Sequence, residues 1–205
     1  TPLPPRQGSL LVGFQSENEL HNFSEEVFDS YVMPLALTGM NEHLIKTLQI
    51  DAPRCRYLMV IRIGGRQMAF DRQLNIMNKM VEQYQDSHTD FLEQNASDRL
   101  WEKIRDFRGY GSISSITGRV FSTPTRLRGL LRDMANHFEE IGSTLAVSIQ
   151  PGFGTMEFYI ESLLAEDKTR PTQVIEQIHN IARQNQSHIN YEKLPPDLKI
   201  GFNMW

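Results

Sequence analysis

Cysteine is nearly absent from this sequence of 205 residues, in which Cys55 is the only one. A single cysteine excludes an internal disulfide and a cysteine metal cluster. The neighbouring Arg54 and Arg56 would lower the pKa of an exposed thiol. A half-buried structural cysteine at the start of a strand is the simpler interpretation, and we expect that one.

Long apolar runs are also missing. No stretch approaches the roughly 18 apolar residues that a membrane-spanning helix needs, and the N-terminus carries no basic-then-apolar signal. The sequence therefore predicts a protein without a transmembrane segment, and we expect a cytoplasmic location.

An excess of positive charge is absent as well. The formal net charge is −4 and the isoelectric point is about 5.9. A surface that binds phosphate groups is usually positively charged, so a negative net charge argues against one. The strands also lack the pattern of basic and aromatic residues that stacks on RNA bases. We therefore expect no nucleic-acid partner.

The common catalytic and cofactor motifs do not occur. There is no Walker sequence, and Gly64-Gly65 lacks the glycine spacing of a dinucleotide-binding loop, so it predicts a turn. Gly152 and Gly154 stand between two predicted strands and likewise predict a turn. None of the six histidines has metal-ligand spacing, and no serine lies in a nucleophile elbow. We expect no metal, and we assign no catalytic residue.

The second half of the chain has a clear pattern of strands and helices. Thr123 followed by Pro124 predicts a helix that starts at about Thr125 and ends before Gly142. Alternating or continuous apolar residues predict the strands, and apolar residues at helical spacing predict the helices. The expected elements are strand Ser112–Phe121, the helix from Thr125, strands Thr144–Gln150 and Thr155–Ser162, helix Pro171–Asn185 and strand His188–Lys193.

The first half repeats this order less clearly. Ser16 and Glu19 form a capping-box pattern before a helix, and Asn41 is expected to cap a short helix that runs to Leu48. Around Pro34, Val32–Met40 is either an edge strand or an extended segment. The other expected elements are strand Ser9–Gln15, strand Tyr57–Ile63, helix Gln67–Gln85, strand His88–Glu93 and a connecting helix Asn95–Phe107 that Ser97 caps.

These patterns predict an α+β fold. It consists of two ferredoxin-like halves of order β-α-β-β-α-β, with antiparallel sheets and helices packed on one face. We expect a Pro-rich linker at 1–8, the first half at 9–94, the connecting helix at 95–110, and the second half with a C-terminal tail at 111–205. We expect the linker to lead from a domain that precedes this chain.

Two residues stand out as candidates for binding. Arg119 lies inside an apolar strand, where an unpaired guanidinium would be costly. It could hold a substrate carboxylate with two hydrogen bonds, point to solvent, or form a structural ion pair with Glu157 or Glu161. At the end of the tail, Trp205 could stack on a ligand or anchor the tail.

Three motifs resemble a known family. They are Glu192-Lys-Leu-Pro195-Pro196-x-Leu198-Lys199 followed by Trp205, Leu100-Trp101-x-x-Ile104-Arg105-Asp106, and Gly118-Arg119-Val120-Phe121-Ser122-x-Pro124. In order and spacing they resemble the C-terminal cap domain of the FAD-linked oxidases. Within these vanillyl-alcohol-oxidase type flavoproteins, the likeness is to the FAD-binding subunit of bacterial glycolate oxidase.

The resemblance implies a function for a longer protein. That protein would hold FAD mainly in an N-terminal domain outside this chain, and it would oxidise a small 2-hydroxy acid. The cap would cover the flavin, with Arg119 near the substrate carboxylate and Tyr159 and Trp205 lining the cleft. FAD-binding residues within the cap are not assigned.

The resemblance also implies partners. These are the N-terminal FAD-binding domain and other oxidase subunits, including an iron–sulfur subunit, through which the protein could associate peripherally with the inner membrane. The histidine and acid clusters of the catalytic partner subunits are missing from this sequence, which favours an electron-transferring or scaffolding subunit. Alone, this chain is expected to be inactive. The alternative is a duplicated ferredoxin-like module without catalysis that binds a small ligand or a partner protein.

Overall fold

The computed structural model describes residues 4–52, 55–107, 115–161 and 170–195. The chain divides into two compact units, Thr1–Arg105 and Asp106–Trp205, and each is described by itself. No helix of the described residues is both long enough and apolar enough to cross a bilayer.

In its described residues, the first unit contains four strands and four helices. They are β1 (Arg6–Phe14), α1 (Glu17–Asp29), β2 (Ala36–Asn41), α2 (Glu42–Thr47), β3 (Tyr57–Gly65), α3 (Gln67–Val81), β4 (His88–Glu93) and α4 (Gln94–Asp106).

The part of the second unit that the structure describes contains four strands, two longer helices and a short 3-10 turn. They are β5 (Ile116–Phe121), α5 (Pro124–Glu140), β6 (Leu145–Gln150), η2 (Pro151–Phe153), β7 (Thr155–Ile160), α6 (Arg170–Gln184) and β8 (His188–Lys193).

Three of the predicted helix starts are confirmed. Ser16 and Glu19 form both hydrogen bonds of a capping box before α1. The Asn41 side chain accepts a hydrogen bond from the Leu44 amide and so caps α2. Thr123 occupies the N-cap position of α5 with Pro124 directly after it.

The strands of the two units have the same connectivity. Within the first unit the strand order is β4-β1-β3-β2, and within the second it is β6-β7-β5-β8, with antiparallel pairing in both. In each unit the first strand pairs with the third and the fourth, and the second strand pairs with the third. The predicted α+β class is therefore confirmed.

Several predicted boundaries differ from the structure. β1 begins at Arg6, because Arg6–Gly8 pair with β3, so part of the expected linker belongs to the sheet. Gly64 lies in the same pairing, and Gly64-Gly65 ends β3 instead of forming a separate turn. Ser97 does not cap α4, since the helix begins at Gln94 and the Ser97 hydroxyl bonds to Ser9 on β1.

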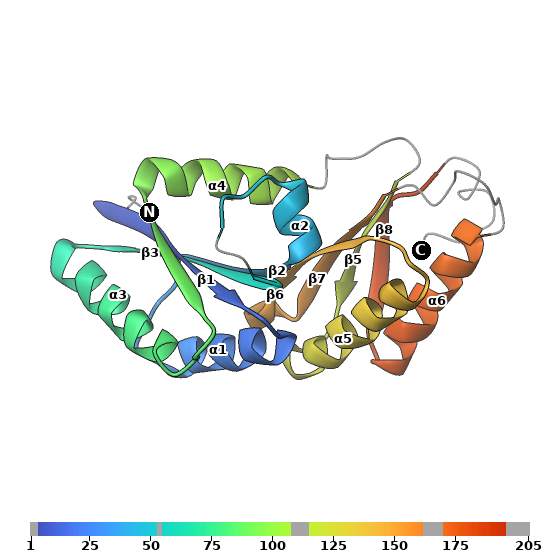
Figure 1. Ribbon diagram of the computed structural model, residues 1–205, viewed down its shortest axis with the longest axis horizontal. Helices are drawn as coiled ribbons and strands as arrows, with labels where there is room; N and C mark the ends of the chain where they lie inside the picture. Colours follow the sequence, from blue (N-terminus) through green and yellow to red (C-terminus); the bar gives the residue numbers. More distant parts are fainter. Residues whose placement is uncertain (1–3, 53–54, 108–114, 162–169, 196–205) are drawn as a thin grey trace. The chain divides into compact units, whose positions relative to one another are not determined.

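The helices of the first unit lie on both faces of its sheet (Figure 1). Phe14 of β1 contacts Phe23 of α1, and Arg6 lies over the Phe70 ring of α3. Ser9 points the other way and bonds to Ser97 on α4. The helices α1 and α3 of the expected first half therefore contact one face, and α4, which was expected as a connecting helix, covers the opposite face.

The second sheet separates its apolar and polar side chains by alternation. Phe158 on β7 and Tyr191 on β8 contact each other, and Tyr191 also contacts His179 of α6, so this face lies under the helices. Glu157 and Tyr159 on β7 point to the other face. This second face carries the candidate site.

Candidate functional site

Arg119 lies opposite Glu157 on neighbouring strands, and the two side chains form a close ion pair. The Arg119 Nε and Nη2 atoms lie 3.0 Å and 2.6 Å from Glu157 Oε1. Nη2 also lies 3.5 Å from Glu192 Oε1 on β8. Arg119 is thus shared by two carboxylates.

Burial makes this pair more than a surface ion pair. Glu157 is only 8% exposed, and the side chain of Arg119 is 28% exposed. A buried carboxylate needs hydrogen-bond donors, and the guanidinium supplies two on one edge. The Arg119 Cζ atom also lies over the Phe121 ring, 5.8 Å from its centroid.

Tyr159 lies on the same face, two residues further along β7 from Glu157. It is opposite Thr117 on β5 and Ala146 on β6, and it is buried. Burial raises the pKa of the Tyr159 phenol, and the nearby Glu161 carboxylate raises it further. The phenol therefore stays neutral and can donate a hydrogen bond at neutral pH.

The structure thus brings together two of the three predicted site residues, Arg119 and Tyr159. The ion pair with Glu157 is one of the interpretations that the sequence left open, whereas the exposed Glu161 forms no ion pair with Arg119. Trp205 lies outside the described residues. Glu192 was not predicted as part of this group, although its position on an antiparallel neighbour of β5 could have indicated it.

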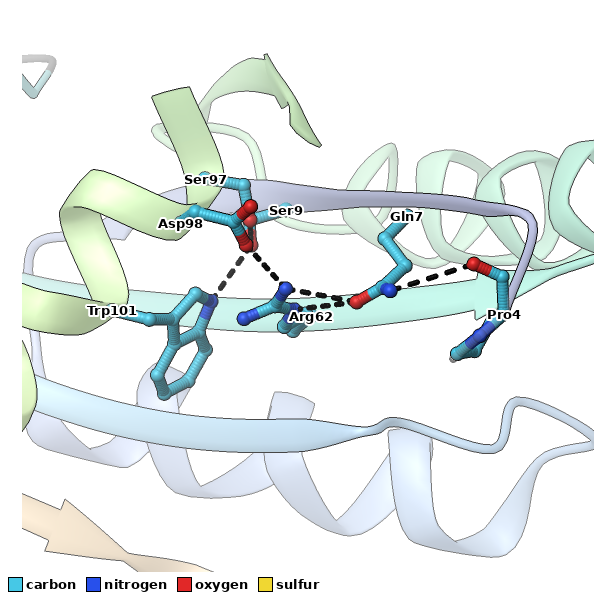
Figure 2. A network of polar contacts seen from close by, with 7 residues as sticks. All are labelled: Pro4, Gln7, Ser9, Arg62, Ser97, Asp98 and Trp101. Atoms are coloured by element: carbon cyan, nitrogen blue, oxygen red, sulfur yellow. Dashed lines mark hydrogen bonds and ion pairs between the residues drawn. The ribbon is translucent and has the colours of Figure 1, made fainter. Parts of the chain in front are cut away.

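A second polar network lies on the corresponding face of the first unit, and Figure 2 shows it from close by. Arg62 on β3 donates to Gln7 Oε1 from both Nε (3.1 Å) and Nη2 (2.8 Å), and it forms an ion pair with Asp98 on α4. The Trp101 indole donates to the Ser9 hydroxyl at 2.9 Å, and Ser9 also bonds to Ser97 at 2.7 Å.

Sequence reasoning missed this network, although a signal was present. Arg62 interrupts the apolar strand Tyr57–Ile63 in the same way that Arg119 interrupts β5. The difference lies in what covers each arginine. In the first unit α4 brings Asp98 and Trp101 to the sheet face and so fills it, whereas in the second unit the partners of Arg119 come from the sheet itself.

Cys55 is buried, as expected for a structural cysteine. Burial raises the pKa of its thiol to about 11, and the charge of Glu42 acts in the same direction. The thiol is therefore protonated and unreactive at neutral pH. Within the described ranges, no three histidine, cysteine or acidic residues are grouped so that they could hold a metal ion.

The glycines do not form a cradle for a dinucleotide phosphate. A Cβ atom on Gly64 would lie 2.7 Å from Leu35 Cδ1 and 3.1 Å from Pro4, so side chains already fill that space. Gly154 has a φ of +63°, which confirms the predicted turn, and a Cβ there would lie 2.1 Å from the Ser122 carbonyl oxygen. Gly64 and Gly154 therefore leave no room for the pyrophosphate of FAD.

Comparisons by sequence find no relatives. No family model matches this chain. No curated protein matches it either.

Comparison of folds finds clear neighbours. One neighbour is p-cresol methylhydroxylase, in a structure with substrate bound. The alignment covers 91% of this chain and 45% of the neighbour's chain, with a TM-score of 0.66 and 10% sequence identity. Another is 4-ethylphenol oxidase from Gulosibacter chungangensis, in complex with isoeugenol. Here the alignment covers 90% of this chain and 44% of the neighbour's chain, with a TM-score of 0.64 and 10% sequence identity.

A third neighbour is alkyldihydroxyacetonephosphate synthase. The alignment covers 91% of this chain and 41% of the neighbour's chain, with a TM-score of 0.59 and 10% sequence identity. All three are FAD-dependent flavoenzymes of the vanillyl-alcohol-oxidase type. At this level of identity the likeness is one of fold. The chain spans less than half the length of each of these neighbours.

Proposed function

We propose that this chain is the cap domain of an FAD-dependent oxidoreductase of the vanillyl-alcohol-oxidase type. The observation that carries the proposal is the alignment of about nine-tenths of the chain with less than half of such enzymes. A match of this kind is expected when a whole domain corresponds to one domain of a larger protein. The repeated strand order supports the narrower description of the cap as two ferredoxin-like halves.

In this proposal FAD is held mainly by an N-terminal domain of the same polypeptide. The closed packing around Gly64 and Gly154 agrees with a cap that does not itself bind the FAD pyrophosphate. The cofactor supplies the redox chemistry when it is bound, and the cap contributes the shape and charge of the substrate side. We assign that side to the sheet face that carries Arg119 and Tyr159.

The test is the absorbance spectrum of the longest polypeptide that the gene encodes around this chain. The proposal predicts a yellow protein that releases stoichiometric FAD on denaturation, whereas the 205-residue chain alone is colourless and inactive. A gene product without flavin and without a flavin-binding domain would overturn it.

A 2-hydroxy acid, as in glycolate oxidase, is the substrate that we propose for the full-length protein. Arg119 is the candidate for binding its carboxylate, and Tyr159 could donate to an oxygen of the same substrate. Because Arg119 is already paired with Glu157, a carboxylate must compete with that side chain or bind at the outer edge of the guanidinium. In this proposal the subunit also contacts other oxidase subunits, including an iron–sulfur subunit.

The substrate proposal is tested by anaerobic bleaching of the flavin with glycolate and lactate. In the double variant Arg119→Gln with Glu157→Gln, which removes both charges together, we expect KM for the acid to rise at least tenfold while the flavin stays bound. A KM that does not change would exclude Arg119 from the substrate site without affecting the assignment of the domain.

The pairing of Arg119 also favours a second candidate function. If Arg119, Glu157 and Glu192 serve only to stabilise the sheet, the chain fits a duplicated ferredoxin-like module that binds a partner protein or a small ligand. The absorbance test above separates the two candidates, since a module of this kind holds no flavin and has no activity, and in it the double variant changes only stability.

A further inference from the structure

Several large apolar side chains are exposed on the first unit, close to the segment that joins α1 to β2. Tyr31, Met33 and Leu35 in this segment are 84%, 79% and 48% exposed, and Met68 in the first turn of α3 is 86% exposed. Isolated exposed apolar residues are ordinary on protein surfaces, whereas a contiguous group indicates an interaction site.

Contacts with α3 join these side chains into one surface. The Met33 amide donates to Gln73 Oε1 at 2.9 Å, and the Arg72 guanidinium lies 6.0 Å from the centre of the Tyr31 ring. Met68 and Arg72 are one helical turn apart, so they share a side of α3. We call the surface made by Tyr31, Met33, Leu35 and Met68 the methionine surface.

The first described residue of the chain lies at the edge of the methionine surface. A Cβ atom on Gly64 would lie 2.7 Å from Leu35 Cδ1 and 3.1 Å from the Pro4 side chain, so these three residues pack together. Gln73, which accepts from the Met33 amide, also donates to the Gly64 carbonyl oxygen at 3.3 Å. A domain attached ahead of Pro4 would therefore be attached beside this surface.

The exposed charges next to the methionine surface are of both signs. Arg72 and Lys79 of α3 are exposed, and so are Asp29 at the end of α1 and Glu82 directly after α3. Polyanions such as nucleic acids and anionic bilayers attract surfaces with an excess of cations, so these charges do not select one. Apolar side chains among charges of both signs match the contacts between domains of one polypeptide, which are more polar than permanent subunit interfaces.

We propose that the methionine surface is where the preceding domain of the same polypeptide packs against this chain. The inference rests on the proposed function, in which an FAD-binding domain comes before the chain, and on the finding that the chain spans less than half of each neighbour in fold. Attachment beside the surface raises the effective concentration of that domain, which favours it over a second copy of the chain. Pro4 and Pro5 have a fixed φ and so restrict the backbone at this point.

Met33 and Met68 are natural probes of this contact. Hydrogen peroxide converts an accessible methionine thioether to the sulfoxide, with water as the other product. Peptide mass spectrometry measures the rate at each methionine, in the 205-residue chain and in the longest polypeptide that the gene encodes around it. We expect Met33 and Met68 to be oxidised about tenfold more slowly in the longer polypeptide.

The matched control is Asn180→Met, which adds a methionine at an exposed position of α6. The introduced methionine should be oxidised at the same rate in both polypeptides. Protection of Met33 and Met68 should persist on dilution, because the contact is within one polypeptide. Protection that dilution removes would assign the surface to a second copy of the chain and overturn the proposal.

Two further outcomes would overturn the proposal. One is equal oxidation of Met33 and Met68 in the two polypeptides, and the other is equal protection of the control position. The absorbance spectrum of the longer polypeptide separates the possible failures. A yellow protein with unprotected methionines would overturn this inference alone, whereas a gene product without flavin and without a flavin-binding domain would overturn the proposed function as well.

Discussion

Arg119 and Glu157 illustrate how one buried carboxylate can determine the role of an arginine. The guanidinium bonds to a single oxygen of Glu157 through two nitrogen atoms, and Glu192 approaches the same Nη2 atom. When the charge of Glu157 is removed, the more distant Glu192 is the carboxylate that remains beside Arg119 among the residues that the structure describes. The guanidinium is partly exposed, so solvent offsets part of that loss.

We expect Glu157→Gln to lower the free energy of unfolding by about 1–2 kcal/mol, the range for hydrogen bonds to charged groups after allowance for exposure. Urea denaturation followed by circular dichroism measures this change. Glu161→Gln is the matched control, because Glu161 is exposed and forms no ion pair with Arg119. A similar loss in both variants would show that the ion pair contributes nothing specific.

For Tyr191, we expect that removing a polar group does not lower the free energy of unfolding, in contrast to Glu157. Its hydroxyl is buried, and no hydrogen-bond partner for it exists among the described residues. A buried hydroxyl without a partner destabilises the fold, so Tyr191→Phe should leave stability unchanged or raise it by about 1 kcal/mol. Tyr84 is the contrast, because its hydroxyl donates to Glu26 at 2.9 Å. Tyr84→Phe should lower stability by about 1 kcal/mol, and the reverse order of the two variants would contradict the structure.

At the scale of elements, α4 is held against its sheet partly through polar contacts. Asp98 pairs with Arg62, and Trp101 and Ser97 both bond to Ser9 (Figure 2). Leu100 and Ile104 add apolar burial on the same helix. Polar contacts depend on geometry more steeply than apolar ones, so they fix the position of α4 along β1.

We expect Asp98→Asn combined with Trp101→Phe to increase amide hydrogen exchange in α4 about tenfold, which corresponds to the loss of about 1.4 kcal/mol of local stability. Exchange in α3 should not change. Arg99→Gln, an exposed substitution on the same helix, is the control. Equal protection of α4 in the double variant and in the control would show that apolar burial alone holds the helix.

At the scale of the whole molecule, ionisation of tyrosines sets the alkaline limit of stability. Burial is the main cause that raises the pKa of Tyr84, Tyr159 and Tyr191 above the ordinary value of 10. Carboxylates add to the effect at Tyr84, through Glu26, and at Tyr159, through Glu161. In the folded protein these phenols stay protonated at a pH where the unfolded chain has already released its protons.

The sign of the pH dependence follows from this difference. Above the unfolded pKa the folded state binds more protons than the unfolded state, so stability falls as pH rises beyond 10. Urea denaturation at increasing pH measures the slope, which should be shallower in Tyr84→Phe. In the native protein, phenolate absorbance should show these tyrosines titrating later than the others. Uniform titration near pH 10 would contradict their burial.

The sequence by itself determined the local elements of this protein, because their causes are local. Apolar periodicity and the caps at Ser16, Asn41 and Thr123 predict helices and strands close to those observed, and the repeated order of elements indicates a duplication. The likeness to FAD-linked oxidases also agrees with the fold of the neighbours, although the sequence comparisons find no relative.

Only the tertiary structure decided which side chains meet across the sheets. Strand register determines that Arg119 faces Glu157, and the packing of α4 determines that Asp98 reaches Arg62. Such pairs join residues far apart in the chain, so no local pattern specifies them. Pairing in three dimensions therefore distinguishes an arginine that is already neutralised from one that is available to a ligand, a distinction on which any function of the sheet face depends.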